Sequence, residues 1–155
     1  MLIDFKEISD DSRLWIYGSD RSFTNQEKEY VIQKIEGYLK TWKYHNNPLR
    51  GAVNILENHF IIIALDDSDF GVGGCSIDGL QRVMQEIEEE IQVSMFNRLN
   101  IFCRINDKIQ CIPLHRLNNI VSDSTFFYDL TIQYKRQLDY FLKPIKEGWC
   151  SYLFR

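Results

Sequence analysis

No stretch of this sequence is apolar for long enough to cross a membrane. A membrane helix needs about 18 consecutive apolar residues, and the longest apolar run here, Phe60 to Leu65, has the length of a strand. The first residues, Met1 to Glu7, also lack the basic region and apolar core of a secretory signal. We therefore expect a cytoplasmic protein that does not engage a membrane.

Positive charge is scarce. The 155 residues carry 18 Lys and Arg against 22 Asp and Glu, which gives a formal net charge of −4. Nucleic acids and anionic membranes attract clustered Lys and Arg, and no such run occurs. We expect no nucleic-acid partner. A small molecule, another protein, or a second copy of the chain in a homo-oligomer suits this composition better.

The cysteines do not form a motif. Cys75, Cys103, Cys111 and Cys150 include no CxxC pair, so reduced thiols are expected in a cytoplasmic chain. The three histidines have neither HxxxH nor HExxH spacing, so the sequence predicts no metal site and identifies no cofactor.

The residues that are abundant are apolar and aromatic. With 45% hydrophobic and 14% aromatic residues, a chain of this length can bury a large core, so we expect one domain over residues 1–155.

The first half of the chain alternates between strand and helix patterns. Residues 13–19 are typical of a strand, and Thr24-Asn25-Gln26-Glu27 matches the capping box that begins a helix. Residues 52–56 and 60–65 follow as a hairpin, and the second of these runs is apolar on both faces, which indicates a central strand. After residue 76, apolar residues recur at helical spacing through Ile91.

The second half begins with another hairpin, residues 99–105 and 109–112. A three-residue loop would place Ile105 opposite Ile109 and Cys103 opposite Cys111, and this match of apolar residues favours that register over a two-residue loop. A short helix after Pro113, a strand at residues 125–130 and a last helix over residues 134–145 complete the pattern.

The resulting order, β-α-β-β-α-β-β-α-β-α, predicts an α+β fold with a mixed, mainly antiparallel sheet. Its first six elements match the ferredoxin-like pattern, with the remainder as a C-terminal extension. A three-layer α/β sandwich has a compatible order and stays open as the alternative.

The segment from Asp66 to Asp78 is the candidate functional site, because a strand passes there through an acidic, glycine-rich loop into a helix. It contains no lysine, which excludes the Walker A motif GxxxxGK[ST]. Six residues separate Cys75 from Arg82, whereas cysteine phosphatases have five, so that class is excluded as well.

Two kinds of chemistry are compatible with this corner. Cys75 at the start of a helix would have a lowered thiol pKa and could act as a nucleophile, with His45 or His115 as the base. The competing interpretation is that Cys75 is a small buried residue where the glycines let helix and strand pack closely.

The corner could instead bind a ligand. Amides at Gly73 and Gly74, with the Ser76 hydroxyl, would bind an anion. Asp66 and Asp78 would suit a divalent cation that accompanies a phosphorylated ligand, although loop solvation and helix capping also explain these acids.

Residues Arg13 to Phe23 and Gly74 to Asp78, together with Pro48-Leu49, resemble a family of small, uncharacterised bacterial proteins that often carry the label "ABC transporter ATPase". The label implies nucleotide hydrolysis. However, the sequence has no Walker A motif, no LSGGQ-type signature and too little length for such a domain, so we judge the label wrong and transfer no catalytic residue from it.

Two hypotheses therefore follow from the sequence. The first is a small ligand-binding or interaction module that uses residues 66–78. The second is an enzyme at the same corner, with Cys75 as a thiolate nucleophile or a metal bound by aspartates. We favour the binding module, because no His or Lys has a spacing that ties it to Cys75.

Overall fold

The apolar run at residues 60–65 forms the centre of a three-stranded sheet. In the computed structural model of the chain, which describes residues 1–67 and 74–154, the run lies in β5 (Phe60–Asp66). β1 (Arg13–Gly18) and β4 (Arg50–Leu56) flank it, and both pair with it antiparallel. Each residue from Phe60 to Leu65 is 0% exposed. The prediction of a central strand covered on both faces is thus confirmed.

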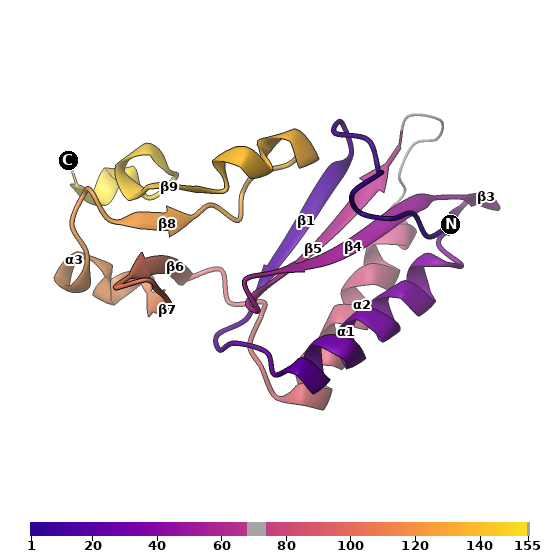
Figure 1. Cartoon of the computed structure of the whole chain (residues 1–155), viewed down its shortest axis with the longest axis horizontal. Coiled ribbons are helices and arrows are strands. Elements are labelled where there is room, and N and C mark those ends of the chain that lie inside the picture. Colours follow the sequence, from indigo (N-terminus) through magenta and orange to yellow (C-terminus); the bar gives the residue numbers. More distant parts are fainter. Residues whose placement is uncertain (68–73, 155) are drawn as a thin grey trace. The chain divides into compact units, whose positions relative to one another are not determined.

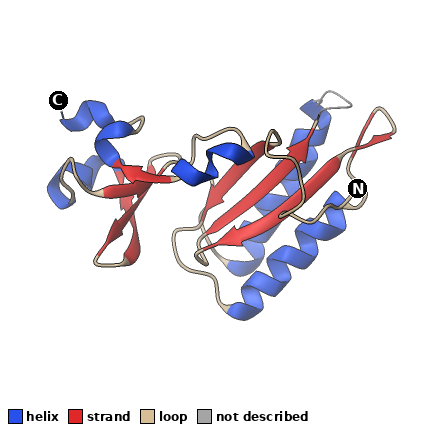
Figure 2. Ribbon diagram, turned by 45° about the horizontal axis from the view of Figure 1, so that its top comes forward, coloured by secondary structure: helices blue, strands red, loops and turns tan. Residues whose placement is uncertain are grey.

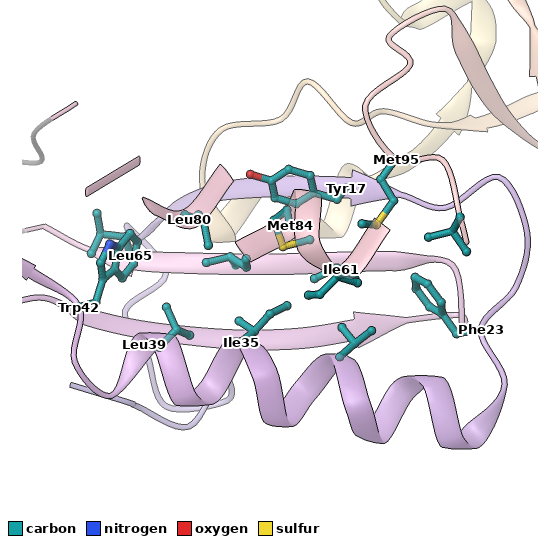
Figure 3. Close-up of a cluster of buried hydrophobic side chains, with 14 of the residues drawn as sticks. Tyr17, Phe23, Ile35, Leu39, Trp42, Ile61, Leu65, Leu80, Met84 and Met95 are labelled. Atoms are coloured by element: carbon teal, nitrogen blue, oxygen red, sulfur yellow. The ribbon is translucent and has the colours of Figure 1, made fainter. Parts of the chain in front are cut away.

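Two helices, α1 (Asn25–Leu39) and α2 (Gly74–Ile91), cover one face of this sheet (Figure 2). The predicted capping box begins α1: Thr24 Oγ1 accepts from the Glu27 amide at 3.1 Å, and the Thr24 amide donates to Glu27 Oε1 at 2.8 Å. The helices and the sheet enclose the core in Figure 3, whose labelled members are Tyr17, Phe23, Ile35, Leu39, Trp42, Ile61, Leu65, Leu80, Met84 and Met95.

The N-terminal segment crosses the other face of the sheet (Figure 1). It begins as a short parallel pairing with β4, in which the Ile3 amide donates to the Gly51 carbonyl at 2.8 Å. Lys135 holds the segment in place, because its Nζ donates hydrogen bonds to the carbonyls of Phe5 at 2.8 Å and Ile8 at 2.7 Å. The buried Ile8 belongs to this cover.

The chain divides into two compact units. The first contains Met1–Met95 with Gln133–Arg136, and the second contains Phe96–Ile132 with the residues from Gln137 onward. Each unit has its own sheet and its own buried cluster. The single domain expected over residues 1–155 stays a prediction, since two compact units of one chain can still unfold as one cooperative domain.

The fold class is α+β, as the sequence predicts. In the first unit, β1 and β4 run parallel with β5 antiparallel between them, which is the strand arrangement of a split β-α-β unit. The ferredoxin-like pattern would return a fourth strand to this sheet. Instead β6 (Asn100–Ile105) joins the sheet of the second unit, where it pairs with β7 (Lys108–Pro113) on one side and β8 (Phe126–Tyr128) on the other. A small hairpin of β2 (Lys43–Tyr44) and β3 (Asn47–Pro48) was not predicted.

The second unit contains a four-stranded antiparallel sheet in the order β7-β6-β8-β9, with β7 (Lys108–Pro113), β8 (Phe126–Tyr128) and β9 (Leu142–Pro144). Four short helices accompany it: η1 (Leu114–Arg116), α3 (Leu117–Ile120), η3 (Ile145–Glu147) and η4 (Ser151–Phe154). A further one, η2 (Lys135–Tyr140), begins in the first unit and ends in the second. Its core consists of Ile101, Cys103, Ile112, Leu117, Phe127, Ile145 and Cys150.

The predicted register of the β6–β7 hairpin is wrong. Ile105 pairs with Lys108 and Cys103 with Gln110, so the loop has two residues. Asn106 and Asp107 both have positive φ, at 54° and 61°, which is the backbone of a type I′ turn that matches strand twist. This turn geometry outweighs the match of Ile105 with Ile109, and the register still pairs Ile101 with Ile112.

The predicted C-terminal helix over residues 134–145 is also wrong. Its first part forms the 3₁₀ helix η2, and residues 142–144 form β9, where Leu142 pairs with Tyr128 and Pro144 with Phe126. Proline lacks the amide hydrogen that a helix interior needs, whereas the end of an edge strand accepts it. Pairing with β8 therefore replaces the last helical turn.

Arg21 provides a pH-dependent link between the two helices. Its guanidinium donates to both carboxylate oxygens of Glu27, at 2.8 and 2.7 Å, and to the carbonyl of Ile91, at 2.6 Å. The bonds from the Arg21 guanidinium and the bond from the Thr24 amide lower the pKa of the Glu27 carboxyl to about 2. Since the pKa is lowered on folding, the stabilisation is present above about pH 4.5 and is lost as the pH falls toward 2.

We expect Glu27→Gln to lower the free energy of unfolding by about 1 kcal/mol at pH 7, because glutamine keeps the cap but not the ion pair. The variant should also lose less stability than the wild type between pH 4.5 and 2, as measured by urea unfolding. Glu29→Gln, an exposed change on the same helix, is the control. An unchanged pH slope in Glu27→Gln would contradict this account.

Candidate functional site

The predicted site lies where β5 ends and α2 begins. β5 ends at Asp66, and α2 begins at Gly74. Gly73 lies outside the described residues, and so do the side chains of Cys75 and Ser76, whereas the backbone of Gly74, Cys75 and Ser76 is described. The backbone of these last three residues forms the first turn of α2. Cys75 therefore has the helix-start position that the sequence predicts for it, at the positive end of the helix dipole.

Asp66 is held at the corner by a residue of the neighbouring strand. The β4–β5 register places Arg50 directly opposite Asp66, and Arg50 Nε lies 3.6 Å from Asp66 Oδ2. The Asp66 side chain is 14% exposed and that of Arg50 is 46% exposed. The carboxylate is thus mostly enclosed, while the guanidinium still faces solvent with part of its surface.

The other two acids differ in exposure. Asp67 is half-buried directly after β5, and Asp78 is exposed on α2. Within the two described ranges, no group of three His, Cys, Asp or Glu residues could hold a metal ion. The acid pair of Asp66 and Asp78 proposed for a divalent cation stays a prediction.

Tyr38 packs against the first turns of α2. A Cβ atom at Gly79 would overlap the Tyr38 hydroxyl, so the glycine allows the phenol of α1 to lie against the backbone of α2. Burial raises the pKa of the Tyr38 phenol, and the nearby charge of Arg82 opposes this effect. The start of α2 is therefore fixed against α1 by a close contact.

The two candidate bases lie in different units. His45 is exposed in the β2–β3 turn with φ of 50°, and its ring centroid lies 4.1 Å from that of Tyr44. His115 is exposed in η1 of the second unit. The proximity of either imidazole to the Cys75 thiol stays a prediction.

The other three cysteines, Cys103, Cys111 and Cys150, have described side chains and are reduced thiols. Burial raises the pKa of the Cys103 thiol to about 12, and burial also raises that of Cys150. Cys111 lies opposite Phe102 rather than Cys103, so the two cysteines are not directly paired across the hairpin. Cys103 and Cys150 are core residues in the second unit.

The sequence did not single out Arg50 or Tyr38. The pairing of Arg50 with Asp66 could have been predicted from the turn at residues 57–59. A three-residue turn pairs Leu56 with Phe60, and moving away from the turn along both strands then pairs Arg50 with Asp66. Tyr38 had no such signal, because its contact with Gly79 depends on how α1 and α2 pack.

Comparison with known proteins adds no family to these observations: no family model, curated protein or solved structure matches the chain. Across the described ranges, no helix has the length and apolar character needed to span a bilayer.

The contact of Tyr38 with Gly79 gives a direct test of the corner's packing. Gly79→Ala should lower the free energy of unfolding by about 1 kcal/mol, because the overlap outweighs the better helix propensity of alanine. Tyr38→Phe removes the overlapping oxygen and leaves the ring carbon Cζ at 3.1 Å from the new methyl, so Gly79→Ala should cost clearly less in Tyr38→Phe than in the wild type. Gly37→Ala on α1, where the new methyl would meet no atom within 4 Å, should stabilise the protein. Equal effects of alanine at both glycines in denaturant unfolding would contradict the contact.

Proposed function

We propose that the protein is a small ligand-binding or interaction module whose ligand binds at the corner between Asp66 and Asp78. The observation that supports this most is the Arg50–Asp66 pair at the end of the central strand. It places a partly exposed guanidinium beside a mostly enclosed carboxylate at the end of β5, and the next helix along the chain is the 18-residue α2, which begins at Gly74.

These groups favour an anionic ligand. A guanidinium binds phosphate or carboxylate oxygens through paired hydrogen bonds. The unpaired amides at the start of α2 attract negative charge as well. Asp66 and Asp67 repel a bare anion, so a divalent cation that accompanies a phosphorylated ligand would improve binding. The proposed ligand is thus a small phosphate-bearing molecule, bound with or without a cation.

A thermal-shift titration tests this proposal with inorganic phosphate, nucleotides and MgCl₂, each alone and combined. A ligand at about 100 times its Kd stabilises a protein by about 2.7 kcal/mol, which is a measurable rise in Tm. Arg50→Gln should reduce the rise, whereas Arg98→Gln, an exposed change in the second unit, should not. If no ligand raises the Tm, or if Arg50→Gln and Asp66→Asn leave the rise unchanged, the proposal is wrong.

The helix-start position of Cys75 supports a second candidate, an enzyme with a thiolate nucleophile. Unpaired amides and the helix dipole at the first turn lower a thiol pKa. Under this alternative the thiol would attack an electrophilic substrate bound at the same corner, and His45 or His115 would take its proton.

Alkylation with iodoacetamide across pH separates the two candidates. If Cys75 is a catalytic thiolate, the rate should follow an apparent pKa well below the usual value of about 8.5. Cys75→Ala gives the background from the other thiols, of which Cys103 and Cys150 should react slowly because burial raises the pKa of both. The half-buried Cys111 contributes to this background, and the subtraction removes it. An apparent pKa at or above 8.5, or no reaction of Cys75, would exclude the enzyme.

A further inference from the structure

The outer edge of β4 is less covered than the outer edge of β1. β1 is met by the segment at residues 133–134, where the Leu14 amide donates to the Gln133 carbonyl at 2.8 Å and Arg13 bridges to Tyr134. β4 is met by the N-terminal segment at Gly51, whose amide donates to the Met1 carbonyl at 2.9 Å. The backbone N–H and C=O groups of successive residues in a strand point toward opposite edges. Those of Gly51 point away from β5, so the groups of Val53 and Ile55 do as well.

Part of this edge is protected. Asn54 Oδ1 accepts from the Ile55 amide at 2.9 Å, so a side chain of β4 caps one outward donor. In the part of the chain that the structure describes, no group pairs with the amide and carbonyl of Val53 or with the carbonyl of Ile55. An edge with unpaired backbone groups is a template for a further strand.

A pocket lies beside these unpaired groups. It has a volume of about 490 Å³ and forms where the N-terminal segment leaves the edge of β4. Leu2, Phe5 and Val53 contribute apolar surface. Of the charged residues, Asp4 and Glu36 add two carboxylates and Lys6 adds one ammonium group, so the lining carries an excess of one negative charge. Among the described residues, no Lys or Arg forms an ion pair with Glu36.

We propose that the outer edge of β4 binds an extended basic peptide segment as an added strand. The Val53 amide and the carbonyls of Val53 and Ile55 would form the ladder bonds. A Lys or Arg of the peptide would place its aliphatic stem on Leu2 and Val53 and its charge beside Glu36. This surface goes beyond the ligand site at the corner and does not depend on it.

A second copy of the chain suits this edge less well. A two-fold axis at Asn54 would pair Val53 of each copy with Ile55 of the other and bring the two α1 helices side by side. Glu36, which lines the pocket together with Val53 and Asn54, would then approach its own equivalent. Like charges oppose that arrangement, whereas a basic peptide relieves them.

The test uses a capped heptapeptide of alternating lysine and valine, with its affinity for the full chain measured by calorimetry. It should bind, and the matching glutamate–valine peptide should not. The lysine–valine peptide N-methylated at every residue should lose binding, because it cannot donate to the edge. Asp66→Asn should leave the peptide affinity unchanged, which separates this surface from the corner.

Variants of the chain locate the peptide. Val53→Pro removes only an outward amide, so it should weaken binding by about tenfold, while Val53→Ala should not. Glu36→Lys should weaken binding by about fivefold, and Glu29→Lys, an exposed change on the same helix, should not. If Val53→Pro fails to fold, Glu36→Lys and the N-methylated peptide decide the question.

Three results would overturn the proposal: no binding of the lysine–valine peptide, equal binding of the glutamate–valine peptide, or binding unaffected by both Glu36→Lys and N-methylation. A wild-type dimer in sedimentation that Val53→Pro converts to a monomer would identify a second copy as the occupant, and would overturn the peptide proposal too.

Discussion

The first unit depends on one constraint: β5 is apolar along both faces and must be covered on both. Fully burying a large aliphatic side chain contributes about 1.5–3 kcal/mol, and β5 carries four such residues, Ile61 to Ile63 and Leu65, all 0% exposed. One face packs against α1 and α2, and the N-terminal segment crosses the other (Figure 1). The neighbouring strands then follow, because the backbone of a buried strand needs partners along both edges.

The same constraint places the candidate site. A central strand that ends at Asp66 must turn back toward the layer that covers it, and α2 begins that return at Gly74. Polar groups lie at this end of the sheet because β5 is no longer fully buried beyond Leu65, so its residues there need not be apolar. Arg50 and Asp66 meet across the last register position of the hairpin. The corner is thus a consequence of how the core is built.

Sequence patterns predicted the elements that depend on local chemistry. The capping box at Thr24 and the continuous apolar run of β5 were interpreted correctly, since a helix start and a strand buried on both faces each have a recognisable local sequence. The register of the hairpin at Asn106-Asp107 was predicted wrongly, because the prediction considered only which apolar residues would face each other. It did not take into account the positive φ angles that Asn and Asp adopt in a two-residue turn. The residues of β9 were misread because a helical spacing of apolar residues also occurs by chance over short stretches.

By itself, the sequence determined the α+β class, the central strand, the two covering helices and the position of the corner. All of these depend on periodicity and on residues close together in the chain. Only the tertiary structure decided that β6 joins a second sheet, that Tyr38 rests on Gly79, and that β4 keeps an unpaired edge at Val53. These features depend on which surfaces meet, and residues far apart in sequence leave no local pattern that specifies their contact.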